Sequence, residues 1–130
     1  MIIIPESKIQ QEIVTDFNNN YCLKRHSPRL IIYSIPNGIP IPLPPKERAR
    51  ALDLLKKTGS LNGASDLIIQ GVNGRVINVE VKSDTKQSPD QVKFQERVEC
   101  LGGVYLLVYS LLDFQLKIEP YLKWLKNENN

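Results

Sequence analysis

The sequence has few of the residues that build metal centres from nitrogen and sulfur ligands. Its 130 residues include one histidine, His26, and two cysteines, Cys22 and Cys100. A single histidine excludes a histidine-rich zinc site, and the two cysteines lack the close spacing of zinc-binding pairs. Both cysteines lie in largely apolar or helical surroundings, so we expect buried free thiols in a reducing cytoplasm.

Long hydrophobic runs, internal repeats and glycine-rich phosphate loops are also missing. The apolar residues 1–4 are far too short a run to span a membrane, and no secretory signal pattern is present. We therefore expect no membrane association. The lack of a Walker-type glycine loop argues against a nucleotide cofactor, and no serine or cysteine triad is recognisable.

The overall composition is that of an ordinary globular protein. Hydrophobic residues make up 42% of the chain and charged residues 24%. The length predicts one domain over residues 1–130. A net charge of +3 supports nucleic-acid binding only weakly.

Hydrophobic periodicity predicts an α/β fold. Helical patterns cover residues 5–18, 47–57 and 88–101, and a closing helix begins at Pro120. Strand patterns cover residues 30–35, 66–70, 76–82 and 104–109. Asn73-Gly74 predicts a tight hairpin, and helix 88–101 is long enough for a parallel crossover. We expect three antiparallel strands, a crossover helix and a parallel fourth strand, with helix 47–57 inserted between the first two strands.

Asp66 and the run Glu80-Val81-Lys82 carry the clearest chemical signal. Side chains alternate along a strand, so Glu80 and Lys82 share one face. Pairing of the two middle strands can bring Asp66 beside them. Two carboxylates suit a hard divalent cation, and a nearby lysine suits a water nucleophile or a phosphate oxygen. The pattern indicates metal-assisted phosphodiester hydrolysis, and an ordinary Glu–Lys pair on a surface hairpin is the alternative.

On these residues the chain resembles the PD-(D/E)XK nuclease superfamily and, within it, the stand-alone, phage-type members of the VRR-NUC family. The matching stretches are Ile35-Pro36-Asn37-Gly38, Gly63-Ala64-Ser65-Asp66-Leu67, Val79-Glu80-Val81-Lys82, Ser88-Pro89-Asp90-Gln91 and Leu101-Gly102-Gly103-Val104. They follow the family's order over most of the chain between Glu6 and Tyr109. The resemblance implies a restriction-endonuclease-like core with a mixed four-stranded sheet flanked by helices, and the host cytoplasm as location if a phage encodes the chain.

The resemblance also implies a metal-dependent active site. Mg²⁺ or Mn²⁺, as one ion or two, would be held by Asp66, Glu80 and the main-chain carbonyl of Val81. Lys82 would orient or deprotonate the attacking water and stabilise charge on the phosphate. Gln91 would fix the geometry of water or metal, unless its amide simply bonds to the backbone.

The first helix of the family adds an acidic or amide residue to the metal site. Glu6 points almost to the centre of the apolar stripe of helix 5–18 and is our candidate, whether it reaches the metal directly or through water. Gln10 lies close beside it and is the second choice. The alternative for Glu6 is a solvated acid in the first turn of the helix, where the helix dipole favours it.

Further residues are candidates for DNA contacts. Lys46, Arg48 and Arg50 lie at the start of a predicted helix, although a solvated helix face explains basic residues almost as well. Asn37 would face substrate or a metal-bound water, or would serve only as a turn residue. Ser65 follows Gly63-Ala64, whose small size leaves room for a phosphate or simply makes a turn.

The function implied is a structure-selective DNA endonuclease acting on branched DNA, such as Holliday junctions or flaps, in repair or recombination. The alternatives are a sequence-specific restriction-like endonuclease and a catalytically inert DNA-binding module. Symmetric resolution of a four-way junction needs two incisions, so we expect a homodimer. If the closing helix does not simply cover its own sheet, the candidates for the interface are Tyr105, Tyr109, Phe114, Tyr121, Leu122 and Trp124.

Overall fold

The computed structural model describes residues 3–36 and 41–128. Its centre is a four-stranded sheet with the order β1-β2-β3-β4. The first three strands pair antiparallel and the fourth pairs parallel to β3. The strands are β1 (Ile31–Ser34), β2 (Leu67–Gln70), β3 (Val76–Val81) and β4 (Val104–Val108). The predicted α/β fold class and mixed sheet are confirmed.

The hairpin between β2 and β3 sets the register on which the site depends. Asn73 and Gly74 adopt positive φ angles of 56° and 70°, which is why this pair suits a tight turn. The register pairs Leu67 with Val79. The strands run antiparallel, so the residue before Leu67 lies opposite the residue after Val79. Asp66 therefore lies opposite Glu80.

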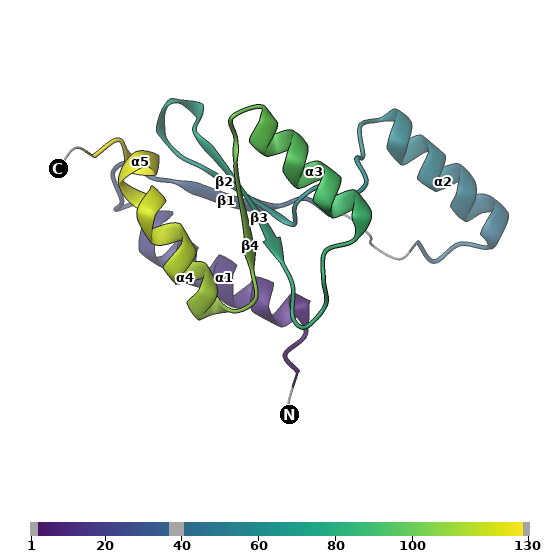
Figure 1. Cartoon of the computed structure of the whole chain (residues 1–130), viewed down its shortest axis with the longest axis horizontal. Helices are drawn as coiled ribbons and strands as arrows, with labels where there is room; N and C mark the ends of the chain where they lie inside the picture. The colour runs from purple at the N-terminus through teal and green to yellow at the C-terminus, as the bar shows by residue number, and fades with distance from the viewer. Residues whose placement is uncertain (1–2, 37–40, 129–130) are drawn as a thin grey trace.

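One face of the sheet carries the hydrophobic core. Helix α1 (Glu6–Tyr21) buries Ile9, Ile13 and Phe17, and helix α4 (Leu111–Ile118) buries Phe114 and Ile118. Both helices lie on the same side of the sheet in Figure 1. Alternation along the strands directs the same-face residues of β3 into this core, namely Ile77, Val79 and Val81. Asn78 and Glu80 consequently point to the opposite face.

Helix α3 (Pro89–Cys100) lies against that opposite face, beside β4. The rings of Phe94 in α3 and Tyr105 in β4 lie 6.1 Å apart. Ser88 caps the helix and Pro89 is its first residue, positions that suit a serine and a proline. This crossover helix connects β3 to β4, and its N-terminus lies against Gly63, in the segment just before β2.

Helix α2 (Pro45–Lys57) stands apart from the rest of the molecule, as Figure 1 shows. The predicted helix is confirmed, but none of its residues is buried. The apolar residues Leu52, Leu54 and Leu55 are 46%, 61% and 47% exposed. The helix inserted between β1 and β2 is thus not part of the core.

The C-terminal region contains one helix more than expected. The single predicted closing helix is replaced by α4, a 3₁₀ turn (Glu119–Tyr121) and the short α5 (Leu122–Lys126). The spacing of Phe114 and Ile118, four residues apart, places both on one helix face. Leu116 between them is 66% exposed.

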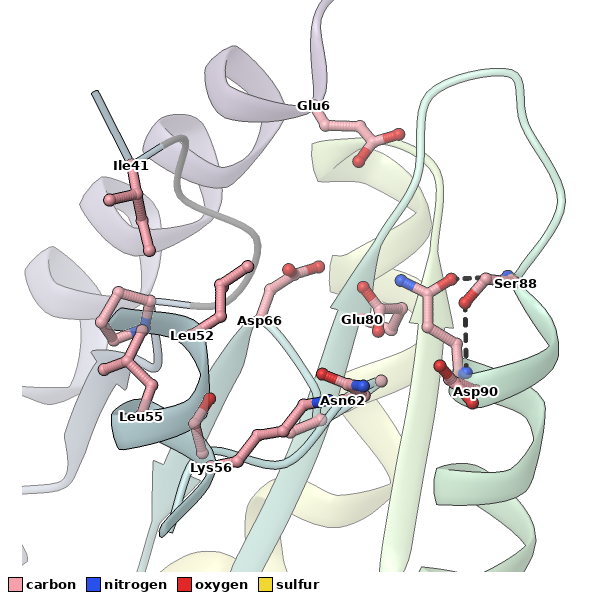
Figure 2. Close-up of a pocket in the computed structure, with 15 residues that line it drawn as sticks. Glu6, Ile41, Leu52, Leu55, Lys56, Asn62, Asp66, Glu80, Ser88 and Asp90 are labelled. Atoms are coloured by element: carbon pink, nitrogen blue, oxygen red, sulfur yellow. Dashed lines mark hydrogen bonds between the residues drawn. The ribbon is translucent and has the colours of Figure 1, made fainter. Parts of the chain in front are cut away.

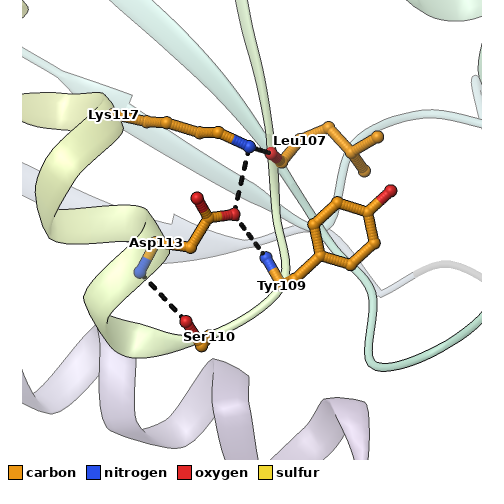
Figure 3. A network of polar contacts seen from close by, with 5 residues as sticks. All are labelled: Leu107, Tyr109, Ser110, Asp113 and Lys117. Carbon is orange, nitrogen blue, oxygen red and sulfur yellow. Dashed lines mark hydrogen bonds and ion pairs between the residues drawn. The ribbon is translucent and has the colours of Figure 1, made fainter.

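A polar network fixes the turn from β4 into α4 (Figure 3). Ser110 caps the helix by accepting a hydrogen bond from the Asp113 main-chain N–H at 3.0 Å. The Asp113 carboxylate accepts from the Tyr109 N–H at 2.9 Å and pairs with Lys117 at 3.0 Å. The Lys117 ammonium also donates to the carbonyl of Leu107. The Ser110 hydroxyl, the Asp113 carboxylate and the Lys117 ammonium therefore each have a local structural role.

Two expectations about buried side chains require correction. Cys22 is buried as expected, but Cys100 is exposed because it ends α3 on the solvent side. Among the proposed interface residues, Tyr105 and Phe114 are buried within the chain, so neither is available to a partner.

In the part of the chain that the structure describes, no helix has the length and apolar character needed to cross a membrane.

Candidate active site

A cleft of about 690 Å³ lies where α1, α2, α3 and the adjoining ends of β2 and β3 approach one another. The acidic residues Glu6, Asp66 and Glu80 line it together with Gln91. Figure 2 shows the Asp66 and Glu80 side chains near one another, with Leu52 and Leu55 of α2 on one side of the cleft and Ser88 at the start of α3 on the other. The structure therefore brings residues far apart in the sequence to one surface.

A hydrogen bond from the main chain of β3 fixes the position of the Asp66 side chain. Its Oδ2 atom accepts a hydrogen bond of 2.8 Å from the N–H of Val81, the residue after Glu80. The bond lies at the end of the paired segment of β2 and β3, where the ladder no longer uses that N–H. Asp66 is thereby held beside Glu80 on the site face of the sheet.

Glu80 is almost completely buried, with 1% of its surface exposed. Burial, followed by hydrogen bonding and charge from Asp66, raises the pKa of Glu80 to about 9, while Lys82 and Tyr105 act in the opposite direction. The proton therefore stays on Glu80 at neutral pH when no cation is near. The negative charge of Asp66 opposes the ionisation of Glu80. A divalent cation between the two groups would remove this repulsion and let both ionise.

The donor set fits a hard cation such as Mg²⁺ or Mn²⁺. Within residues 3–36 and 41–128, no three His, Cys, Asp or Glu side chains are grouped closely enough to hold a metal together. A metal here would have two side-chain carboxylates, those of Asp66 and Glu80, and the Val81 carbonyl and water would complete its shell. Such a set suits Mg²⁺, which commonly keeps several waters and binds through one or two carboxylates.

Of the two candidates in α1, Glu6 lines the cleft and Gln10 does not. The Oε2 atom of Glu6 lies 3.5 Å from the Thr85 hydroxyl, which donates to it. Gln10 lines a different depression, beside Tyr33 and Ser34. The geometry therefore keeps Glu6 within reach of the site, although not in one cluster with Asp66 and Glu80.

Gln91 also lines the cleft, and its side chain caps α3 as well. Its Oε1 accepts from the Ser88 N–H at 2.8 Å, while Ser88 Oγ accepts from the Gln91 N–H at 3.2 Å. This reciprocal pair is a capping box, which the Ser-x-x-Gln spacing could have predicted. The cap holds the amide in one orientation at the edge of the cleft.

Lys82 follows β3 directly and is half-buried. Its charge lowers the pKa of Glu80, so the two groups interact through space. Among the described side chains, its ammonium forms no ion pair within 4.0 Å with Asp66 or Glu80. Val81 turns its own side chain into the core and contributes only main-chain atoms to the site.

The predicted DNA contacts have mixed outcomes. Lys46, Arg48 and Arg50 are exposed on α2, where Arg48 donates to the Leu43 carbonyl at 3.0 Å. Asn37 lies outside the described residues. Ser65 requires correction, because it is fully buried and bonds at 3.2 Å to Asn78 rather than facing solvent. Sequence reasoning missed four polar lining residues, Lys56, Ser60, Asn62 and Asp90.

Gly63 has a packing role as well as its place in the cleft. Its φ of +81° favours glycine, and a Cβ there would lie 2.3 Å from the carbonyl oxygen of Asp90. No side chain fits between the loop and the start of α3. The small residue thus lets the segment before β2 contact α3 backbone to backbone.

Among solved structures, a VRR_NUC domain protein has the same fold, with a TM-score of 0.66. The likeness covers 95% of this chain and 92% of that chain, at 19% sequence identity. No family profile and no curated protein matches the sequence. The chain therefore has the fold of a VRR_NUC domain protein over nearly its whole length.

Proposed function

We propose that the chain is a divalent-metal-dependent DNA endonuclease, formed by one nuclease domain over residues 1–130. The observation that carries the proposal is the pair of carboxyl groups of Asp66 and Glu80, held side by side in a cleft of a VRR_NUC-like fold. Glu80 is buried beside Asp66, and burial raises its pKa, so its ionised form is unfavourable there unless a cation is near.

The metal would be Mg²⁺ or Mn²⁺, one ion or two, held by Asp66, Glu80 and the Val81 carbonyl, with Glu6 reaching it directly or through water. When bound, such an ion lowers the pKa of water and neutralises charge on a phosphate. Asp66 is already oriented for this by the Val81 N–H. Glu6 comes from a separate helix, and its carboxylate lines the same cleft.

Lys82 and Gln91 would act on water and phosphate. Lys82 follows Glu80 by two residues, so strand alternation would direct both to the same face. Its ammonium would orient the attacking water and stabilise phosphate charge, or its neutral amine would take the proton of that water. Gln91 would fix a water from the side, because its capping bonds hold the amide at the edge of the cleft. Gln91 lines the cleft from α3, whereas Lys82 is not among the lining residues.

DNA is the proposed substrate, and branched DNA is the preferred form. Lys56 lines the cleft and would supply positive charge there. Lys46, Arg48 and Arg50 are exposed on the same helix and would contact phosphates outside the cleft. No recognition element beyond this helix is evident in the described residues. Equal cleavage of junction, flap and splayed substrates of unrelated sequence would support structure selection. Cleavage of a linear duplex at one motif would favour a restriction-like enzyme instead.

An inert DNA-binding module is the second candidate function. Every position of the Asp66, Glu80, Lys82 motif is filled, so we rank it below an active enzyme. Calorimetric titration with Mn²⁺ separates the two, because an inert module shows no binding above background. Asp66→Ala serves as the control that removes a proposed ligand.

We also propose a homodimer, which would supply two centres for symmetric junction cleavage. Of the expected interface residues, Tyr109 and Trp124 remain 41% and 38% exposed, while Tyr121 and Leu122 pack partly against their own core. The exposed leucines of α2 add a second apolar surface. Sedimentation at micromolar concentration tests the proposal, and a monomer mass with two-sided cleavage intact would refute it.

A further inference from the structure

Tyr105 lies behind Glu80 on the neighbouring strand β4. Its hydroxyl donates to Glu80 Oε1 at 3.3 Å, and both residues are buried. The Phe94 ring of α3 packs against the Tyr105 ring, with centroids 6.1 Å apart. The tyrosine ring is therefore held between the sheet and the crossover helix, with its hydroxyl directed at the carboxyl group.

Gln87 determines which way the hydroxyl donates. Its amide nitrogen donates one hydrogen bond to Gln95 Oε1 at 3.0 Å and another to the Tyr105 oxygen at 3.2 Å. An amide nitrogen carries two protons, so both are used. Because the tyrosine oxygen accepts from Gln87, its single proton is left for Glu80.

We propose that Tyr105 is a positioning residue that holds Glu80 Oε1 and so leaves Oε2 for the cation of the proposed active site. The inference rests on the proposed function and extends it to a residue outside the cleft lining. A buried carboxylate that binds a metal needs its remaining lone pairs satisfied and its rotamer fixed. Tyr105 and Gln87 do both without contacting substrate.

The direct test is calorimetric titration of the full chain with Mn²⁺. Tyr105→Phe keeps the ring and its contact with Phe94 but removes the hydroxyl. We expect Mn²⁺ to bind it about 10-fold more weakly than the wild type, within the range typical of outer-shell partners of metal ligands. Tyr109→Phe is the matched control, because Tyr109 is exposed and its ring contacts Lys117 instead. Its Mn²⁺ affinity should match the wild type.

A second variant covers the case in which Tyr105→Phe does not fold. Gln87 is half-buried in the loop before α3, so Gln87→Ala disturbs the hydroxyl without opening the core. We expect it to weaken Mn²⁺ binding in the same direction, by about 3-fold, because the hydroxyl loses its fixed orientation.

Cleavage at rising Mn²⁺ concentration supplies the readout that a purely structural defect would not give. In Tyr105→Phe the half-saturating Mn²⁺ concentration should rise, while the rate at saturating Mn²⁺ returns close to the wild-type rate. If both variants bind Mn²⁺ as tightly as the wild type, the positioning role of Tyr105 is overturned, but the proposed function is not. Failure of the wild type itself to bind Mn²⁺ would overturn the proposed function and this inference with it.

Discussion

The Asp66 carboxylate accepts a hydrogen bond of 2.8 Å from the main-chain N–H of Val81, directly beside Glu80. The bond ties an acid at the start of β2 to the end of β3 without using any other side chain. A side chain that keeps an oxygen acceptor at position 66 can still form this hydrogen bond. Mutation can therefore remove the charge of Asp66 without changing the geometry.

Asp66→Asn should abolish divalent-dependent DNA cleavage while leaving the fold in place. The amide oxygen can still accept from Val81, but the position loses its charge, so we expect a fall of about 100-fold or more in rate. The thermal midpoint should move by no more than a few degrees. Asp84→Asn changes an exposed acid in the loop after β3 and is the control. Cleavage by Asp66→Asn at the control rate would contradict the assignment, as would full activity of Lys82→Ala.

The metal-free protein should lose stability as pH rises from 5 to 9. The pKa of Glu80 is raised from 4.5 to about 9, so the folded state binds more protons than the unfolded state between these values. The contribution of Glu80 to the free energy of unfolding is then greatest below pH 4.5 and is lost as pH rises toward 9. Its slope is at most ~1.4 kcal/mol per pH unit. Urea unfolding in a chelator at several pH values measures the slope.

Glu80→Gln should flatten this dependence, because an amide does not ionise. Glu96→Gln, on the exposed side of α3, is the matched control and should retain the wild-type slope. Added Mn²⁺ should reduce the slope in the wild type but not in Glu80→Gln. An unchanged slope in Glu80→Gln would mean that another group controls the pH response.

Gly63→Ala should destabilise the fold by more than the strain of its φ angle alone. Gly102 has nearly the same φ, +82° against +81°, but a Cβ at Gly102 would meet no atom within 4 Å. Gly102→Ala therefore reports the backbone strain, about 1–2 kcal/mol. The contact of Gly63 with the Asp90 carbonyl should add at least ~1 kcal/mol to that figure. Equal losses in the two variants, measured by denaturant unfolding, would show that the loop moves away from α3 without penalty.

Ser88→Ala should lower both stability and activity. Loss of the capping box removes about 1 kcal/mol of stability and releases the Gln91 side chain at the cleft. Ser110→Ala removes an equivalent cap at α4, which lies on the other side of the sheet. The two variants should have similar unfolding midpoints in urea, and only Ser88→Ala should cleave DNA more slowly. Equal activity would leave Gln91 with a purely structural role.

The sheet could be predicted from the sequence because each strand and the Asn73-Gly74 turn leave a local pattern. The register then follows, and with it the pairing of Asp66 with Glu80. The role of Tyr105 could not be predicted, because an apolar strand of five residues does not reveal which neighbour its one hydroxyl meets. The burial of Ser65 and the exposure of Cys100 likewise depend on how loops and helices pack, which periodicity does not specify.

The separation of α2 from the core has a consequence for how such a chain can diverge. The carboxylates are anchored by the sheet, whereas the helix that borders them contributes no buried residue. Substitutions in α2 can therefore change charge, length or shape at the rim of the cleft without unfolding the protein. The helix that would contact a substrate is free to vary quickly, while the part that would carry out the chemistry is constrained by the stability of the sheet.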